Sequence, residues 1–115
     1  MTVLIVEPGK VPRRAEIGND LKSMQEVVGG LIQAVYPFEE PVALICNEEG
    51  KLQNLPMNRF LMDENGVVYD LVVGTFFLCS APADSEKFES LSEEQISRYH
   101  EVFRNPKLFP GGENG

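Results

Sequence analysis

The sequence predicts an α+β domain, with a mixed or mostly antiparallel sheet of about five strands and two helices packed against it. Short apolar runs bounded by glycine and proline recur along the chain, which is typical of strands. Two other segments carry apolar residues at helical spacing. The chain has 115 residues, 43% of them hydrophobic, enough for one domain with its own core. We expect this domain to span residues 1–106, and residues 107–115 to form a flexible C-terminal tail.

The first elements are a buried strand and a short amphipathic helix. Residues 3–6 form a continuous apolar run that ends in a turn-forming sequence, which predicts a strand buried on both faces. Residues 20–28 place apolar side chains at helical spacing, and Gly29 and Gly30 follow them. Glycine in the left-handed conformation commonly ends a helix, so we expect this one to stop there.

Two strands follow, and Pro37 and Pro41 lie in the connection between them. Residues 31–36 alternate in a two-residue period, and residues 42–46 are almost entirely apolar. The short connection predicts that the two strands are antiparallel neighbours. If residues 31–36 form an exposed edge, a homodimer through sheet extension stays open.

Two acidic turns, residues 47–50 and 63–66, each end in glycine. We expect Gly50 and Gly66 to adopt a positive φ and to close hairpins, with the Asn-Gly pair at the second turn giving the stronger signal.

The segment between these turns, residues 52–60, is harder to assign. Pro56 argues against a central strand because proline has no backbone amide donor. Asn58 is instead expected to cap a single turn formed by residues 59–61.

Residues 72–80 are the densest β region of the chain and predict a central strand. Phe76 and Leu78 should face one side of the sheet, and Phe77 and Cys79 the other. Gly74 within this strand marks a bulge or a close approach of another backbone.

The last element is a second helix. Ser92 and Gln95 have the spacing of a capping box. Ile96, Tyr99 and Phe103 then line one face, which we expect to pack on the sheet.

The net charge of −8 is concentrated in the middle of the chain, since residues 39–94 carry twelve acidic and three basic side chains. This sign disfavours direct binding to nucleic-acid phosphates, which depends on Lys and Arg. An acidic surface usually serves solubility. The alternative is that Glu39, Glu40, Glu48, Glu49, Asp63 and Glu64 form one face that mimics a polyanion.

The sequence contains no pattern of a secretory signal and no apolar run long enough to span a membrane, so we expect a cytoplasmic protein without membrane partners. In that compartment Cys46 and Cys79 are expected to be buried, reduced thiols. There is no CxxC spacing and His100 is the single histidine, so we expect no metal and no cofactor.

Nothing in the sequence has the arrangement of a catalytic site. No serine lies in a G-x-S-x-G turn, and His100 lies on the polar side of the last helix. We therefore expect no enzyme activity, with an enzyme acting on a nucleotide-like substrate as the remote alternative.

Ligand-binding residues are predicted in one polar group, formed by Asn54, Asn58 and Arg59 with Asp70 on the following strand. An arginine can grip a carboxylate or phosphate with two hydrogen bonds, and an asparagine can read an amide or a base edge. Replacing Arg59 by Ala should then abolish binding with little loss of thermal stability. The alternative is local: Arg59 pairs with Asp70 or a turn acid, and Asn58 caps the adjacent turn.

Three strings, VVGGLIQAVYPF, PVALICNEEGKLQNLPMNR and ENGVVYDLVVGTFFLCS, resemble a small domain-of-unknown-function family of Firmicutes and their phages, plasmids and conjugative elements. The likeness extends from about residue 3 to residue 80. It implies no activity and transfers no residue role, but members accompany mobile-element genes, including antirestriction genes. The resemblance therefore implies an accessory or counter-defence role by association.

Together these observations predict a non-enzymatic binding module, a mobile-element or phage accessory protein that recognises a protein or a small polar ligand. The alternative is an acidic DNA-mimic inhibitor of a nucleic-acid-binding restriction or defence protein.

Overall fold

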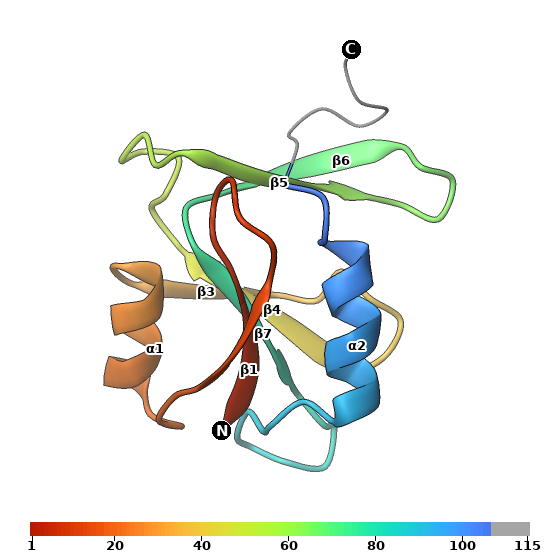
Figure 1. Ribbon diagram of the computed structural model, residues 1–115. Helices are drawn as coiled ribbons and strands as arrows, with labels where there is room; N and C mark the ends of the chain where they lie inside the picture. Colours follow the sequence, from red (N-terminus) through yellow and green to blue (C-terminus); the bar gives the residue numbers. More distant parts are fainter. Residues whose placement is uncertain (107–115) are drawn as a thin grey trace.

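The computed structural model describes residues 1–106, and the predicted tail at residues 107–115 lies outside the described residues. Strands β1, β2, β3, β4 and β7 form an antiparallel sheet in the order β2-β1-β7-β4-β3, while β5 and β6 form a separate antiparallel hairpin. Figure 1 shows α1 and α2 on opposite sides of the large sheet and the hairpin across one end of it. This is the α+β fold that the sequence predicts. The elements are β1 (Thr2–Val6), β2 (Arg13–Glu16), α1 (Leu21–Val28), β3 (Ile32–Val35), β4 (Val42–Asn47), β5 (Met57–Met62), β6 (Val68–Val73), β7 (Phe76–Ser80) and α2 (Glu93–Val102).

The core has two halves, one on each face of the large sheet. Strand β7 serves both, because successive side chains of a strand point to opposite faces. Phe76 and Leu78 pack on the α2 side, where Tyr99 of the helix meets them, and Phe77 packs on the α1 side with Met24. Both the central place of β7 and its alternation are confirmed.

Local signals set the ends of both helices as predicted. Gly29 has φ 80° and its N–H donates to the carbonyl of Gln25 at 2.8 Å, which ends α1. At α2, Ser92 Oγ accepts from the Gln95 N–H at 3.1 Å, and Gln95 Oε1 accepts from the Ser92 N–H at 2.9 Å. This reciprocal pair is the predicted capping box.

The strand predicted over residues 72–80 is wrong in one respect, because Gly74 divides it. Its φ of 75° turns the chain, so β6 ends at Val73 in the hairpin and β7 begins at Phe76 in the large sheet. The predicted close approach of another backbone is present, since the Gly74 N–H donates to the Pro56 carbonyl at 2.7 Å. A Cβ at Gly74 would also lie 2.7 Å from Leu55 Cδ1.

Two predictions for the middle of the chain are wrong. Gly50 does not adopt a positive φ and closes no hairpin, because β4 and β5 belong to different sheets; only Gly66, at φ 79°, closes one. Residues 59–61 form no capped turn but lie in β5, which pairs with β6 from Met57 onward. Pro56 is compatible with this strand because it lies just before it.

Strand β3 pairs with β4 in antiparallel register, as predicted, and lies at an edge of the large sheet. Its second edge is thus available for sheet extension, and a homodimer through β3 stays a prediction. The opposite edge is β2, a short polar strand that the sequence patterns did not indicate.

Candidate functional site

A cavity of about 200 Å³ lies where the hairpin meets the large sheet. Strands β3 and β4 supply Gln33, Val35 and Cys46, β6 supplies Asp70 and Val72 from the other side, and the connection after β4 supplies Lys51 and Leu52.

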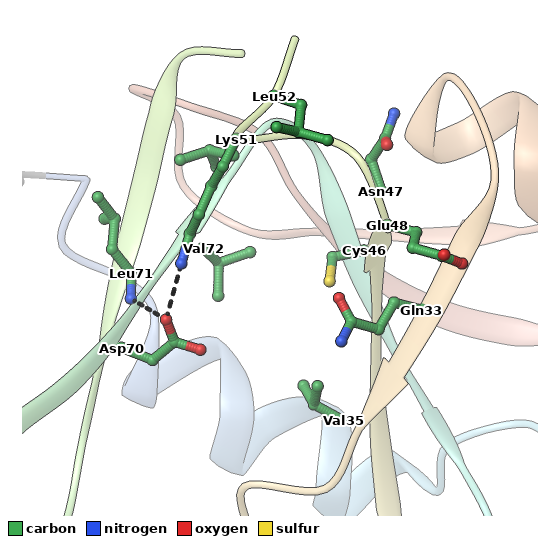
Figure 2. Close-up of a pocket in the computed structure, with 11 residues that line it drawn as sticks. Gln33, Val35, Cys46, Asn47, Glu48, Lys51, Leu52, Asp70, Leu71 and Val72 are labelled. Atoms are coloured by element: carbon green, nitrogen blue, oxygen red, sulfur yellow. Dashed lines mark hydrogen bonds and ion pairs between the residues drawn. The ribbon is translucent and has the colours of Figure 1, made fainter. Parts of the chain in front are cut away.

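Strand register explains why these side chains share one space. Gln33 is the partner of Cys46 in the β3–β4 pair, and partners in an antiparallel pair project on the same face. Val35 lies two residues further along β3 and so faces the same side. In Figure 2 the Gln33 amide and the Cys46 sulfur point across the cavity toward Asp70 and Lys51.

Asp70 is the acidic group of this cavity. Its Oδ1 accepts from Lys51 Nζ at 3.1 Å and from the Leu71 N–H at 2.8 Å. Among residues 1–106, no protein group binds its second oxygen, the Gln33 amide or the Cys46 thiol. Three polar groups are therefore available to a molecule in the cavity.

The Cys46 thiol is electrostatically linked to the same pair. Burial raises the pKa of Cys46, the Asp70 carboxylate raises it further, and Lys51 acts in the opposite direction. A raised pKa keeps the sulfur protonated at neutral pH, and the thiol is a poor nucleophile in that form. The second free cysteine, Cys79, is fully buried in the sheet, and burial raises its pKa to about 12. Neither sulfur has the properties of a catalytic cysteine.

Asn58 lies inside the protein, with 1% of its surface exposed. Its Nδ2 donates to the carbonyls of Val6 at 2.9 Å and Gly74 at 2.8 Å. These bonds connect the hairpin to the end of β1 and to the turn at Gly74 between β6 and β7.

Arg59 is buried beside it, 4% exposed, and its guanidinium binds neutral oxygens. Nε and Nη2 donate to the Phe103 carbonyl at 3.1 and 2.9 Å, Nη2 also to the Lys10 carbonyl at 2.5 Å, and Nη1 to Asn58 Oδ1 at 2.8 Å. Burial lowers the pKa of Arg59. The carbonyl end of a helix carries partial negative charge, so the cation compensates the end of α2.

The structure therefore brings only one of the predicted site residues, Asp70, into the cavity. Asn54 lies on the surface at φ 56°, outside the lining, while Asn58 and Arg59 are committed to internal contacts. The ion pair considered between Arg59 and Asp70 is wrong, since Asp70 pairs with Lys51. Binding roles for Asn54, Asn58 and Arg59 stay predictions.

Gln33, Cys46 and Lys51 are the lining residues that sequence reasoning missed. A signal existed for Gln33, because it is a polar residue between the apolar Ile32 and Ala34 of a predicted strand. Lys51 had no such signal, because its position depends on how the connection after β4 folds back toward β6.

The acidic residues of the middle segment lie at three separate places in the fold. The pairs at 39–40 and 48–49 flank opposite ends of β4, about 20 Å apart for a six-residue strand. Asp63 and Glu64 lie at the hairpin tip, where Asp63 Oδ1 accepts from the Asn65 and Val67 N–H groups. Glu40 is bound by α2 through Gln95, Arg98 and Tyr99.

Within residues 1–106, no three His, Cys, Asp or Glu side chains are grouped so that they could hold a metal ion. Neither described helix has the length and apolar character needed to cross a membrane.

Comparison with known protein families gives one match. The model of a family described as a domain of unknown function, DUF3846, matches residues 1–104. The chain belongs to the DUF3846 family. The matched region of this DUF3846 domain includes both helices, the hairpin and the cavity, and it extends beyond the resemblance noted at residues 3–80. No curated protein and no solved structure matches the chain.

Proposed function

We propose that this protein is a non-enzymatic binding module that holds a small polar ligand in the cavity between β3, β4 and β6. One observation carries the proposal: Gln33, Cys46 and Asp70 direct unpartnered polar groups into one cavity from two different sheets. Sites for small molecules typically combine apolar walls with a few converging polar groups. Val35 and Val72 provide such walls here.

The size of the cavity limits the ligand. Drug-sized ligands occupy pockets of roughly 300 to 1,000 Å³. At about 200 Å³, this cavity fits a smaller molecule or a single group that projects from a larger one.

Binding without catalysis agrees with the chemistry of the lining. The raised pKa of Cys46 removes the thiolate that nucleophilic catalysis would use. The single histidine, His100, lies on α2 and does not line the cavity, so no imidazole base is available there.

The acidic DNA-mimic alternative gains no comparable support, because the acids it requires lie at separate places. The proposal also includes an accessory role in a phage, plasmid or conjugative element, in which this domain senses or sequesters a small molecule. This setting comes from the resemblance of the sequence.

Titration of 15N-labelled protein with a set of small polar fragments, followed by NMR, tests the binding module directly. We expect a subset of fragments to shift the Gln33 side-chain amide and the backbone amides of Cys46 and Val72. Gln33→Trp places an indole in the cavity and should abolish the shifts of the Cys46 and Val72 backbone amides. Gln53→Trp, the same change on the exposed connection outside the lining, should preserve them.

Fragments that bind equally well to the Gln33→Trp variant, or a complete absence of shifts at the cavity, would overturn the proposal. Native mass spectrometry of the protein from its native host then identifies any ligand that the cavity retains.

A further inference from the structure

The charges around the cavity favour a positive ligand. Asp70 and Glu48 are acidic and Lys51 is the one basic residue of the lining, so the lining carries a net charge of −1 in a protein of net charge −8. Figure 2 shows the Glu48 carboxylate pointing away from Asp70, so Asp70 is the acid that a ligand meets. An anion such as a phosphate would be repelled by this carboxylate, while a cation would gain from it.

Lys51 holds Asp70 only weakly. The two side chains are 64% and 45% exposed, and ion pairs between exposed groups contribute little because water screens them and both side chains lose freedom. Only Oδ1 of Asp70 is used by Lys51, which leaves the second oxygen unpartnered within residues 1–106. A ligand cation can therefore bind Asp70 beside Lys51 or replace it at small cost.

The wall of the cavity opposite Asp70 offers hydrogen-bond acceptors to a nitrogen donor. The Gln33 side-chain carbonyl is an acceptor with two lone pairs and has no partner within residues 1–106. The Cys46 sulfur is a weak acceptor when protonated. Between these groups and Asp70, Val35 and Val72 offer apolar surface for a short carbon stem.

We propose that the ligand carries a small cationic nitrogen group, an amine or a guanidinium, which binds Asp70 in place of Lys51 and donates to Gln33. This inference rests on the proposed function and specifies the ligand class of the same cavity. Lys51 acts as an internal competitor that occupies Asp70 when the ligand is absent.

The test compares three probes of nearly equal shape and different charge: n-butylguanidine as the cation, n-butylurea as its neutral analogue and valerate as the anion. Each is titrated into the full 15N-labelled chain and followed at the Gln33 side-chain amide. We expect n-butylguanidine to bind about three- to fivefold more tightly than the other two, the scale of an ion pair between partly exposed groups.

Two variants should change the affinity for n-butylguanidine in opposite directions. Asp70→Asn should weaken n-butylguanidine binding about three- to fivefold, because it removes the carboxylate. Lys51→Met should tighten it about threefold, because it removes the competitor.

Matched controls separate this contact from the general attraction of an acidic protein for cations. Asp84→Asn and Lys22→Met change the net charge by the same amounts at exposed positions outside the cavity, and both should leave the affinity unchanged.

Lys51→Met weakening the binding, or n-butylurea binding as tightly as n-butylguanidine, would overturn the inference. If neutral fragments shift Gln33 and Cys46 while n-butylguanidine does not, the binding module stands and only the cation assignment fails. If nothing binds the cavity, both fail. A blocked peptide containing arginine that binds more tightly than n-butylguanidine at the same residues supports the cation and indicates a protein partner.

Discussion

Arg59 is a cation inside the protein, and within residues 1–106 its hydrogen bonds go to neutral oxygens and to no carboxylate. Its surroundings are carbonyl oxygens from Phe103 and Lys10 and the amide oxygen of Asn58. A buried charge is tolerated only when its donors are satisfied. The bonds to Phe103 and Lys10 join Arg59 to parts of the chain that are distant in sequence, while the bond to Asn58 stays within β5. The residue therefore fastens α2 and the β1–β2 connection to the hairpin.

Replacing Arg59 by Met should lower the free energy of unfolding by about 3 kcal/mol or more, because buried carbonyls lose their donors. Urea denaturation followed by circular dichroism measures this. Arg104→Met is the matched control, since Arg104 lies on the surface near Glu101 and its loss should cost about 0.5 kcal/mol or less.

The loss of stability expected here differs from the sequence-based expectation that replacing Arg59 would lower thermal stability only a little. Equal stability of the Arg59→Met and Arg104→Met proteins would show that the internal hydrogen bonds contribute little.

At the scale of elements, the division between β6 and β7 creates the cavity. If residues 72–80 continued as one strand, Val72 would lie in the large sheet. Because the chain turns at Gly74, β6 instead pairs with β5 and presents Asp70 and Val72 to the side chains of Gln33 and Cys46 on β3 and β4. Glycine suits this position because its φ is positive and Leu55 leaves no room for a Cβ.

Gly74→Ala should therefore destabilise the protein more than Gly66→Ala. Both positions have a positive φ, which costs alanine about 1 kcal/mol. At Gly66 a Cβ meets no atom within 4 Å, while at Gly74 it meets Leu55 at 2.7 Å. Thermal unfolding of the two variants measures the difference. Adding Leu55→Ala to Gly74→Ala should recover part of the loss, and no recovery would exclude the contact as its cause.

At the scale of the whole molecule, Glu40 joins the β3–β4 connection to α2. Its carboxylate accepts from Gln95 Nε2 and from the Tyr99 hydroxyl, both at 2.8 Å, and it pairs with Arg98. The hydrogen bond from Gln95 is the largest cause of the lowered pKa of Glu40, with Tyr99 and Arg98 acting in the same direction and burial opposing them. Burial raises the pKa of Tyr99 to about 12, so its hydroxyl stays a donor.

A lowered pKa makes the contribution of Glu40 to the stability of the folded protein dependent on pH. The contribution is present above the ordinary carboxyl pKa of 4.5 and is lost as the pH falls through the lower value of the folded protein. Glu40→Gln should thus lower Tm at pH 7, by an amount corresponding to about 1 to 2 kcal/mol, and the difference from the unmodified protein should shrink toward pH 3.

Calorimetric Tm values at several pH values measure this dependence. Glu39→Gln is the neighbouring control, since Glu39 is exposed and its substitution should change Tm little at any pH. If the Tm difference for Glu40→Gln stays constant down to pH 3, the negative charge of Glu40 does not contribute to the contact between the β3–β4 connection and α2.

The sequence by itself determined the features that depend on neighbouring residues. The stop of α1 at Gly29, the capping box of Ser92 and Gln95, and the two-sided burial of β7 each follow from hydrogen bonds or side-chain periods within a few residues. Of the candidate site, the sequence indicated only Asp70.

Only the tertiary structure decided which side chains meet. Gln33 and Asp70 are far apart in the chain and belong to different sheets, and Arg59 contacts a carbonyl 44 residues away. Such contacts depend on strand register, on the turn at Gly74 and on how the hairpin packs against the large sheet. No local pattern specifies them, because their free energy comes from burying surfaces that exist only once the sheets and helices have assembled.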